Sequence, residues 1–313
     1  MGSVLITDEC HPILKEGLEQ LGWRCDFLPE ITPEETRARI SAYEGLVINS
    51  KILVNEDFLN AAVKLRFVAR LGSGMEIVDR EYAALRGVKV WSSPEGNRNA
   101  VAEQALGMLL TLANNLLRAD REVRQNIWRR EANRGWEIKG KVLGIVGFGH
   151  TGSQFARKLA GMDMGVLAYD KYKPKGFAGQ MSWVQEVNLA EIQERSDIIS
   201  LHLPLTAETR HFMDAKFIQH CKQGFVLINT ARGHCVCTSD LVEALKSRQM
   251  GGACLDVFEQ EKPQNFTENE KALYGQLHLL ENVVLSPHIA GWTRESKKLL
   301  AEVLLEKIAL SMV

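Results

Sequence analysis

Short apolar segments alternate with amphipathic segments along the first hundred residues of the chain. Runs such as VLIT at 4–7 and GLVIN at 45–49 predict buried strands, and segments such as 12–22 carry apolar residues at the spacing of a helix. This alternation is typical of βαβ units that build a parallel sheet. We therefore expect a small flavodoxin-like layered domain at the beginning of the chain.

A second series of strand and helix patterns runs from 141–149 to 282–291. Before it, a long helical pattern is expected from near Arg98 to about Ala119. Its apolar face has steps of three and four, with members Val101, Ala105, Met108, Leu112 and Leu116. Within the series, the irregular stretch 261–276 is interpreted as a surface loop.

A last helical pattern, from Thr293 onward, is expected to return to the first domain. The predicted fold class is therefore α/β, with two Rossmann-like or flavodoxin-like domains that each contain a parallel sheet. We expect residues 98–285 to form an inserted domain. Residues 1–97 together with 286–313 are expected to form the domain that surrounds it in the sequence.

The composition is that of an ordinary soluble protein, with 313 residues, 45% of them hydrophobic, and a formal net charge of -1. No basic excess or charged tail predicts a nucleic-acid partner. The longest apolar run, 105–113, ends at Asn114 and is too short for a membrane span. The six cysteines form no CxxC pair, so we expect reduced thiols, a cytoplasmic location and no metal site.

The stretch VGFGHTG, at 146–152, follows a buried strand pattern and opens a helix. Gly147 permits a sharp turn, Gly149 lets the backbone approach a pyrophosphate, and Gly152 lets the helix pack on the strand. His150 is either an ordinary surface residue or a contact of the pyrophosphate, whose charge the helix N-terminus favours. Glycines also gather at ordinary turns, so the motif needs support from other residues.

Asp170 provides that support, because it ends the next predicted strand, where a carboxylate can accept hydrogen bonds from the adenosine ribose. The same carboxylate would repel a 2'-phosphate. This favours NAD over NADP, although Lys171 and Lys173 weaken the exclusion.

Polar residues follow later strands of the same series, at the sheet edge where ligands bind. Arg232 follows the apolar run FVLIN, and its planar fork suits a substrate carboxylate. His288 lies at a similar exit and can exchange a proton near neutral pH. Glu261, five residues after Asp256, could pair with His288 and favour its protonated form.

The motifs GFGHTG with Asp170, NTARG, LDVFEQE and SPHIAG, in this order and spacing, resemble the D-isomer-specific 2-hydroxyacid dehydrogenases over nearly the whole chain. The resemblance implies that Arg232, Glu261 and His288 are catalytic and that the protein is a homodimer. It also implies that the inserted domain, 98–285, binds the cofactor and that the domain of 1–97 and 286–313 binds the substrate. With the glycine turn, it implies NAD contacts at Ser73, Gly147, Gly149, His150, Thr151, Gly152, Asp170, Leu203, Thr209, Thr230, Ala231, Asp256, Ala290 and Gly291.

Within that family, residues 48–79 and the stretch SPEGN look most like the branch that oxidises 3-phosphoglycerate to 3-phosphohydroxypyruvate in serine synthesis. The expected substrate contacts are Asn49, Ser50, Lys51, Arg70, Gly72, Gly74 and Asn97. Asn49 stands where this branch usually has an arginine, so the phosphate would need Lys51, Arg70 or another cation. Because the sequence stops at Val313, regulation by C-terminal domains is not expected.

Three alternatives remain open. Asn49 favours a glyoxylate or hydroxypyruvate reductase instead of a phosphoglycerate enzyme. NAD-sensing transcriptional corepressors resemble the same family, and fold alone does not fix function. A nucleotide-binding methyltransferase would account for the glycine turn but leaves Arg232, Glu261 and His288 unexplained.

Overall fold

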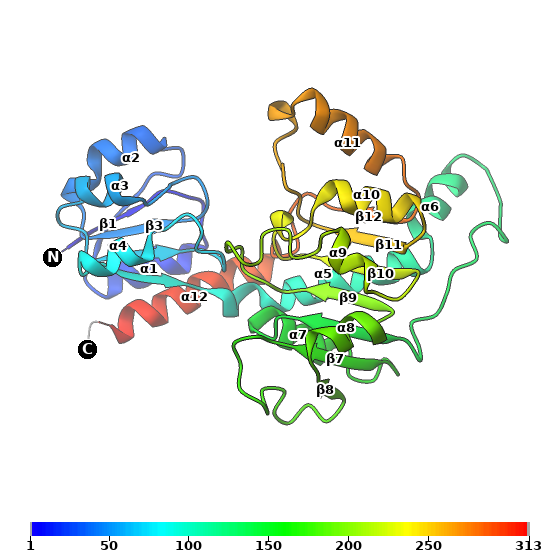
Figure 1. Cartoon of the computed structure of the whole chain (residues 1–313). Helices are drawn as coiled ribbons and strands as arrows, with labels where there is room; N and C mark the ends of the chain where they lie inside the picture. The colour runs from blue at the N-terminus through cyan, green and yellow to red at the C-terminus, as the bar shows by residue number, and fades with distance from the viewer. Residues whose placement is uncertain (1, 312–313) are drawn as a thin grey trace. The chain divides into compact units, whose positions relative to one another are not determined.

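The computed structural model describes residues 2–311, and these form two compact units (Figure 1). One unit contains the residues up to Arg98 and those from Trp292 on, and the other is Asn99–Gly291. Each has one sheet whose paired strands all run parallel. The predicted α/β class with parallel sheets is confirmed.

In the first unit, the sheet has the order β2-β1-β3-β4-β5, the order of flavodoxin-like folds. The chain order reverses between β1 and β3, so the loops after these strands and after β4 lie at one sheet edge. The elements are β1 (Ser3–Ile6), α1 (Pro12–Gln20), β2 (Arg24–Phe27), α2 (Pro33–Arg39), η1 (Ile40–Ala42), β3 (Gly45–Ile48), α3 (Glu56–Ala61), β4 (Phe67–Arg70), α4 (Arg80–Leu85), β5 (Lys89–Ser92) and α12 (Arg294–Leu310).

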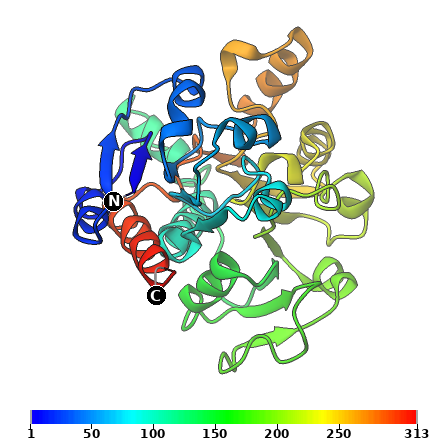
Figure 2. The same cartoon turned by 90° about the vertical axis from the view of Figure 1, so that its left-hand side faces the viewer.

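Helix α12 packs against α1 and β5, as Figure 1 and Figure 2 both show. Helix α12 also lies close to the backbone at Gly96. This contact requires a glycine, because a Cβ on residue 96 would lie 2.6 Å from the backbone nitrogen of Leu300. Lys307 binds the same region, with its Nζ 2.8 Å from Glu95 Oε2 and 2.8 Å from the carbonyl of Ser92. The last helix of the chain is thus part of the core of the first unit.

Helix α5 (Pro94–Ala113) differs from the long helix that the sequence pattern predicts. It begins at Pro94, whose fixed φ suits a first helical turn, and it ends before Asn115, which has a left-handed φ of 51°. A separate helix, α6 (Leu116–Arg124), follows, and Leu116 is 52% exposed. The predicted helix end at Ala119 and the place of Leu116 on its buried face are therefore wrong.

In the second unit, the sheet has the order β12-β11-β10-β9-β6-β7-β8. The order reverses between β6 and β9, which places a crevice for ligands at their carboxyl ends. The elements after α6 are β6 (Val142–Val146), α7 (His150–Lys158), β7 (Gly165–Tyr169), β8 (Val184–Glu186), α8 (Leu189–Arg195), β9 (Ile198–Leu201), α9 (Ala215–Gln219), β10 (Phe225–Asn229), η2 (Gly233–Cys235), α10 (Thr238–Lys246), β11 (Met250–Leu255), η3 (Pro263–Asn265), α11 (Glu268–His278) and β12 (Val283–Leu285).

Helix α11 occupies most of the stretch that was expected to be a surface loop. Thr267 caps it through a reciprocal capping box with Glu270, which satisfies two backbone N–H groups at the helix start. Tyr274 and Leu277 are buried, and the ring of Phe266 stacks on Tyr274 at 4.7 Å. The loop prediction is wrong because few of the helix's residues are apolar and the capping box was not recognised.

The six cysteines are free thiols, four of them buried. Burial raises the pKa of Cys10 to about 11 and that of Cys221 to about 12, so these groups stay protonated near neutral pH. Among the described residues, we find no helix with the length and apolar character needed to cross a bilayer.

Candidate active site

The glycine turn after β6 has two glycines that packing requires and one that it does not. A Cβ on Gly147, which has a φ of 90°, would lie 2.5 Å from the carbonyl oxygen of His202, and a Cβ on Gly152 would lie 2.1 Å from the carbonyl oxygen of Gly147. Gly149 is exposed, has an ordinary φ of -77°, and a Cβ there would meet nothing within 4 Å. The open space beside Gly149 therefore fits a group outside the protein, such as a pyrophosphate.

Helix α7 begins directly after this turn, with His150 and Thr151 as its first residues. His150 is exposed, as the sequence analysis expected. Backbone N–H groups of a first helical turn have no partners within the helix and favour anions. The turn and the helix start thus present the features that a dinucleotide phosphate needs.

Asp170 follows β7 and lies beside the glycine turn. Its Oδ2 accepts a hydrogen bond of 2.8 Å from the backbone N–H of Phe148, and its Oδ1 accepts one of 3.0 Å from Tyr172. A carboxylate has further lone pairs, so these bonds orient the group and leave acceptor capacity for a ribose. Lys171 pairs with Glu208, on the loop after β9.

The loops after β9 and β10 hold the other predicted cofactor residues of this sheet edge. Leu203 lies next to Gly147, and Thr209 closes its own loop by donating a hydrogen bond of 2.6 Å to the carbonyl of Pro204. Ala231 donates its N–H to the side chain of Asn229. Thr230 is buried, and its hydroxyl has no hydrogen-bond partner among the described residues. Because such a group is costly to leave unpaired, it fits a ligand that supplies the partner.

Glu261 and His288 come from loops after different strands, β11 and β12, and form a direct pair. Nδ1 of His288 lies 2.9 Å from Oε2 of Glu261, and both side chains are partly exposed, at 49% and 39%. The other oxygen of Glu261 accepts from the N–H of Phe258 at 3.3 Å. Glu261 therefore contacts Nδ1 of His288 and does not contact the other ring nitrogen, Nε2.

The charge state of Glu261 follows from its neighbours. Burial alone would raise its pKa, but the hydrogen bond and charge of His288, the Phe258 N–H and the charge of Arg232 hold the pKa of Glu261 below its usual value. The carboxylate is therefore ionised at neutral pH. An ionised carboxylate favours the protonated form of an adjacent imidazole.

Arg232 lines the same pocket because Gly233 lets two loops meet. A Cβ on Gly233 would lie 1.9 Å from the carbonyl carbon of Phe258, so no other residue fits there without a shift of the loop. The loop after β10, with Arg232, thus lies against the loop after β11, with Glu261. Asn229 also holds the loop by donating a hydrogen bond of 3.0 Å to the carbonyl of Arg232.

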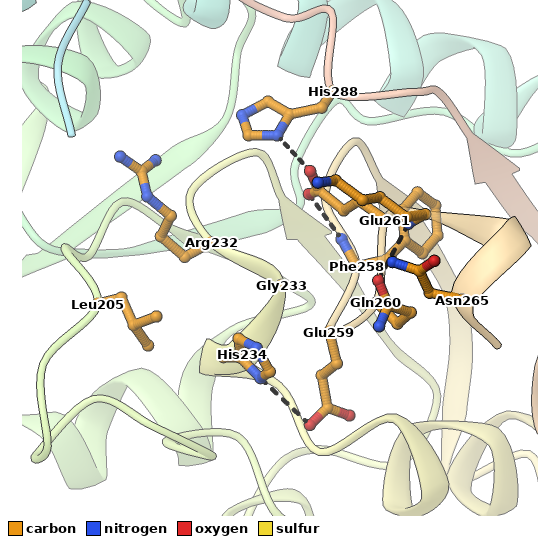
Figure 3. A pocket seen from close by; sticks show the side chains of 11 residues that line it. Leu205, Arg232, Gly233, His234, Phe258, Glu259, Gln260, Glu261, Asn265 and His288 are labelled. Carbon is orange, nitrogen blue, oxygen red and sulfur yellow. Dashed lines mark hydrogen bonds and ion pairs between the residues drawn. The ribbon is translucent and has the colours of Figure 1, made fainter. Parts of the chain in front are cut away.

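The pocket has a volume of about 460 Å³ and lies within the second unit (Figure 3). Figure 3 shows the guanidinium of Arg232 and the ring of His288 on the same side of it, with the Glu261 carboxylate beside the ring. The structure therefore brings the three predicted catalytic residues together. The sequence analysis missed other lining residues, although they flank the predicted ones: Leu205, His234, Phe258, Glu259, Gln260, Lys262 and Asn265.

Asp256 is completely buried and organises the loop that carries His288. Its carboxylate accepts hydrogen bonds from the Ser286 hydroxyl at 2.5 Å and from the N–H groups of Ile289 and Ala290 at 2.9 and 2.8 Å. Its carbonyl accepts the N–H of His288 at 2.7 Å. These bonds hold His288 in a left-handed backbone conformation, with φ at 55°. Ala290, which is buried, and Gly291 complete the loop.

The predicted substrate residues lie in the first unit, at the carboxyl ends of β3 and β4. Nε of Arg70 donates to the carbonyl of Asn49 at 3.2 Å, and Nζ of Lys51 donates to the carbonyl of Pro29 at 2.6 Å. The Arg70 guanidinium lies against Gly72, where a Cβ would approach it to 2.4 Å.

Two further predicted residues of the first unit are joined, because the Ser73 hydroxyl donates to the side chain of Asn97 at 2.8 Å. Ser73 was expected to contact the cofactor and Asn97 the substrate. Ser50 is exposed and Gly74 is buried. Ser73 of the GSG loop and Asn97 near the start of α5 are thus in direct contact.

Comparisons with known proteins agree with this geometry. The family model described as the NAD binding domain of D-isomer specific 2-hydroxyacid dehydrogenases matches residues 106–290. D-3-phosphoglycerate dehydrogenase of Methanocaldococcus jannaschii is 32% identical over 308 residues, which are 98% of this chain and 57% of that protein. Hydroxypyruvate reductase of Thermotoga maritima is 34% identical over 305 residues, 97% of this chain and 92% of that protein.

Among solved structures, D-lactate dehydrogenase from Aquifex aeolicus, complexed with NAD and lactic acid, has a TM-score of 0.82 at 26% identity and covers 99% of this chain and 95% of its own. The chain spans about half the length of the phosphoglycerate dehydrogenases that it matches. The chain belongs to the D-isomer specific 2-hydroxyacid dehydrogenase family, and its second unit contains that family's NAD-binding domain.

Proposed function

We propose that the protein is an NAD-dependent dehydrogenase that interconverts a D-2-hydroxy acid and its 2-oxo acid. The observation that carries this proposal is the Glu261–His288 pair in one pocket with Arg232. It supplies a proton-transfer group, a carboxylate that stabilises its charged form, and a cation for a substrate carboxylate.

In this mechanism, Arg232 binds the substrate carboxylate and orients the carbon that bears the hydroxyl group. His288 exchanges the hydroxyl proton through Nε2, while Glu261 holds Nδ1 and stabilises the imidazolium. NAD, when bound, supplies the acceptor for the hydride. The residues proposed to hold it are Gly149, the first turn of α7, Asp170 and Thr230.

The second unit is proposed to bind NAD, and the first unit the substrate. Asp170 supports NAD over NADP because its carboxylate is fixed beside the glycine turn and would repel a 2'-phosphate. Replacing Asp170 by alanine should raise the KM for NAD and reduce discrimination against NADP. An unchanged ratio of kcat/KM for the two cofactors would contradict this role.

For the substrate, the first candidate is 3-phosphoglycerate, which would place the enzyme at the first step of serine synthesis. The phosphoglycerate dehydrogenases among its relatives support it, and Arg70 is the cation that we assign to the phosphate. Arg70 lies beside Asn49, which stands at the position of the usual arginine of the phosphoglycerate branch.

The second candidate is reduction of hydroxypyruvate or glyoxylate. Asn49 is uncharged, and the ammonium of Lys51 is bound to the carbonyl of Pro29, so neither observation favours a phosphate. The Thermotoga maritima hydroxypyruvate reductase also matches over 92% of its length.

An NADH assay over 3-phosphohydroxypyruvate, hydroxypyruvate and glyoxylate distinguishes the two candidates. If Arg70 binds a phosphate, 3-phosphohydroxypyruvate has the highest kcat/KM, and Arg70→Met removes that preference while Lys51→Met retains it. A wild type with a higher kcat/KM for hydroxypyruvate or glyoxylate than for 3-phosphohydroxypyruvate would favour the second candidate.

We also propose a cytoplasmic homodimer. Helix α6 and the segment after it expose large apolar side chains, with Leu117 57%, Val123 51% and Trp128 77% exposed. Several large exposed apolar side chains close together in the sequence support a surface that a partner covers. Sedimentation equilibrium should give a dimer for the wild type and a monomer for a Leu117→Asp, Trp128→Asp variant, and a monomeric wild type would contradict the proposal.

A further inference from the structure

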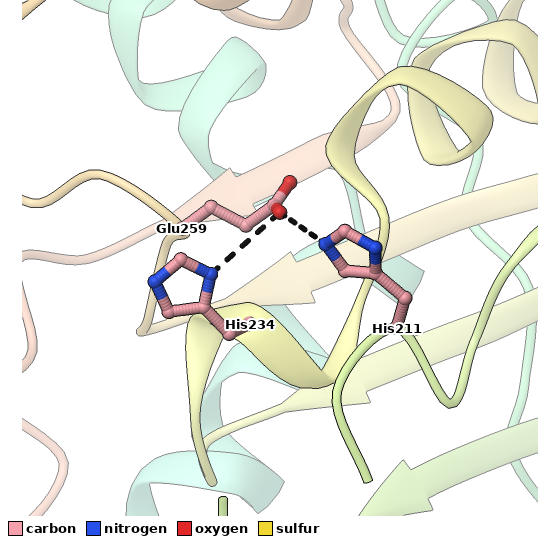
Figure 4. Close-up of side chains that lie close together, drawn as sticks. All are labelled: His211, His234 and Glu259. Atoms are coloured by element: carbon pink, nitrogen blue, oxygen red, sulfur yellow. Dashed lines mark hydrogen bonds and ion pairs between the residues drawn. The ribbon is translucent and has the colours of Figure 1, made fainter. Parts of the chain in front are cut away.

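Two histidines and a glutamate meet at the edge of the pocket, outside the residues assigned to catalysis (Figure 4). Nε2 of His211 lies 2.6 Å and Nδ1 of His234 lies 3.7 Å from the same oxygen of Glu259, Oε1. Figure 4 shows this oxygen between the two imidazole rings. One ligand atom from each residue lies within 4.8 Å of the other two.

Backbone contacts hold the two histidines close together without a bound ligand. The N–H of His211 donates to the carbonyl of His234 at 2.7 Å, and Met213 forms a parallel bridge with Val236. His211 has a left-handed φ of 53°, a conformation that is unfavourable for a non-glycine residue. The neighbouring contacts therefore maintain a strained backbone that aims this imidazole at Glu259.

The third residue is also fixed. The other oxygen of Glu259, Oε2, accepts the N–H of Thr238 at 2.8 Å, which leaves Oε1 toward the imidazoles. Nδ1 of His234 is buried and has no hydrogen-bond partner among the described residues, because 3.7 Å from Oε1 is too long. A cation between the three groups would satisfy this nitrogen.

We propose that His211, His234 and Glu259 bind a Zn²⁺ ion, with water in the fourth position. Two imidazoles and one carboxylate suit zinc, and three protein ligands with one open position are a known arrangement for it. Ligand atoms around a tetrahedral zinc lie roughly 3.3 to 3.5 Å apart. The two observed distances to Oε1 lie on either side of this value, and the two nitrogens lie within 4.8 Å of each other, so side-chain rotations would complete the site.

The site borders the catalytic pocket, since His234 and Glu259 also line that pocket. His234 follows Arg232 by two residues, and Glu259 precedes Glu261 by two. A zinc ion would therefore link the loop after β10, which carries Arg232, to the loop after β11, which carries Glu261. Binding itself does not depend on the proposed dehydrogenase activity and can be measured without turnover.

The test is calorimetric titration of ZnCl2 into tag-free, EDTA-treated and dialysed protein, together with Co²⁺ absorption. We expect one Zn²⁺ per chain and a higher Tm with zinc. Co²⁺ should give the visible bands of a tetrahedral site without a thiolate band, because no cysteine is in the ligand set.

His211→Asn and His234→Asn remove one ligand each, and asparagine tolerates the left-handed backbone at 211. Each should weaken zinc affinity at least about 100-fold, more than the loss typical of outer-shell partners. His220→Asn is the control, since this exposed histidine lies outside the cluster, and it should bind as the wild type does. The Tm of each variant in EDTA reports folding. A wild type that binds no zinc, or wild-type affinity in a folded His234→Asn or His211→Asn, would overturn the proposal.

Discussion

Nδ1 of His288 and Oε2 of Glu261 lie 2.9 Å apart, although the two residues follow different strands. Carboxylate and imidazole therefore act as one unit, and removing the carboxylate removes the group that stabilises a charged ring. We expect Glu261→Gln to lower kcat for reduction of a 2-oxo acid by about 10 to 100-fold, less than the roughly 100 to 10,000-fold that the proton-transfer group itself contributes. Because reduction consumes a proton that this pair delivers, the alkaline limb of activity should move to lower pH in the variant.

The measurement is a pH profile of kcat by NADH absorbance. Glu268→Gln serves as the matched control, because this carboxylate lies in the first turn of α11 and pairs with Lys271. If Glu261→Gln retained both the wild-type kcat and the wild-type pH profile, the pair would have no role in turnover.

Gly233 is expected to be essential for the geometry of the pocket. An alanine Cβ would lie 1.9 Å from the carbonyl carbon of Phe258, so the loop with Arg232 would have to move. Because a displacement of about 1 Å can cost roughly 100-fold in rate, Gly233→Ala should lower kcat/KM by at least that amount. Gly275→Ala, in α11 with nothing within 4 Å of its Cβ, is the control and should leave kcat/KM unchanged.

Gly149→Ala should separate folding from cofactor binding. A Cβ at this position meets no protein atom within 4 Å, so unfolding free energy should change by no more than about 1 kcal/mol, the usual range for a helix N-cap. The same methyl group would occupy the space that we assign to the pyrophosphate. NADH titration by fluorescence should show at least a tenfold higher Kd, whereas an unchanged Kd would place the phosphate elsewhere.

His202 should make the protein less stable in mild acid. It is buried, and burial lowers its pKa to about 4, whereas an unfolded histidine titrates near 6.5. Below pH 6.5 the unfolded chain binds a proton that the folded chain does not, so stability is present above that pH and is lost as pH falls toward 4. Between pH 7 and pH 5 the loss from this residue should be about 2 kcal/mol.

Urea unfolding at pH 7 and pH 5 measures this effect. His202→Phe, which keeps a ring beside Phe155 but cannot titrate, should lose less stability over the same interval. An equal loss in both proteins would show that other groups cause it.

Two of the three proposed catalytic residues could be predicted from the sequence because each follows a strongly apolar strand pattern in a parallel sheet, whose carboxyl ends meet at one edge. Arg232 and His288 are such residues. The signals that were missed are local: the left-handed Asn115 ends a helix whose apolar spacing continues to Leu116, and the capping box at Thr267 starts α11.

The cluster of His211, His234 and Glu259 could not be predicted in this way. It depends on the bridge between Met213 and Val236 and on the side-chain orientation of Glu259, which are contacts between segments far apart in the sequence. No spacing of ligands along the chain indicates such a site. Its recognition requires the three-dimensional positions of the loops after β9, β10 and β11.

The most direct test of the central claim is the NADH-dependent reduction of the three 2-oxo acids by the wild type and by His288→Asn. Asparagine tolerates the left-handed backbone of His288, so the loop should keep its conformation while the proton-transfer group is lost. We predict turnover by the wild type, a loss of about 100 to 10,000-fold in kcat for His288→Asn with an unchanged Kd for NADH, and wild-type kcat for the exposed control His278→Asn. No turnover of any of these acids by the wild type, or near-normal kcat in His288→Asn, would contradict the account.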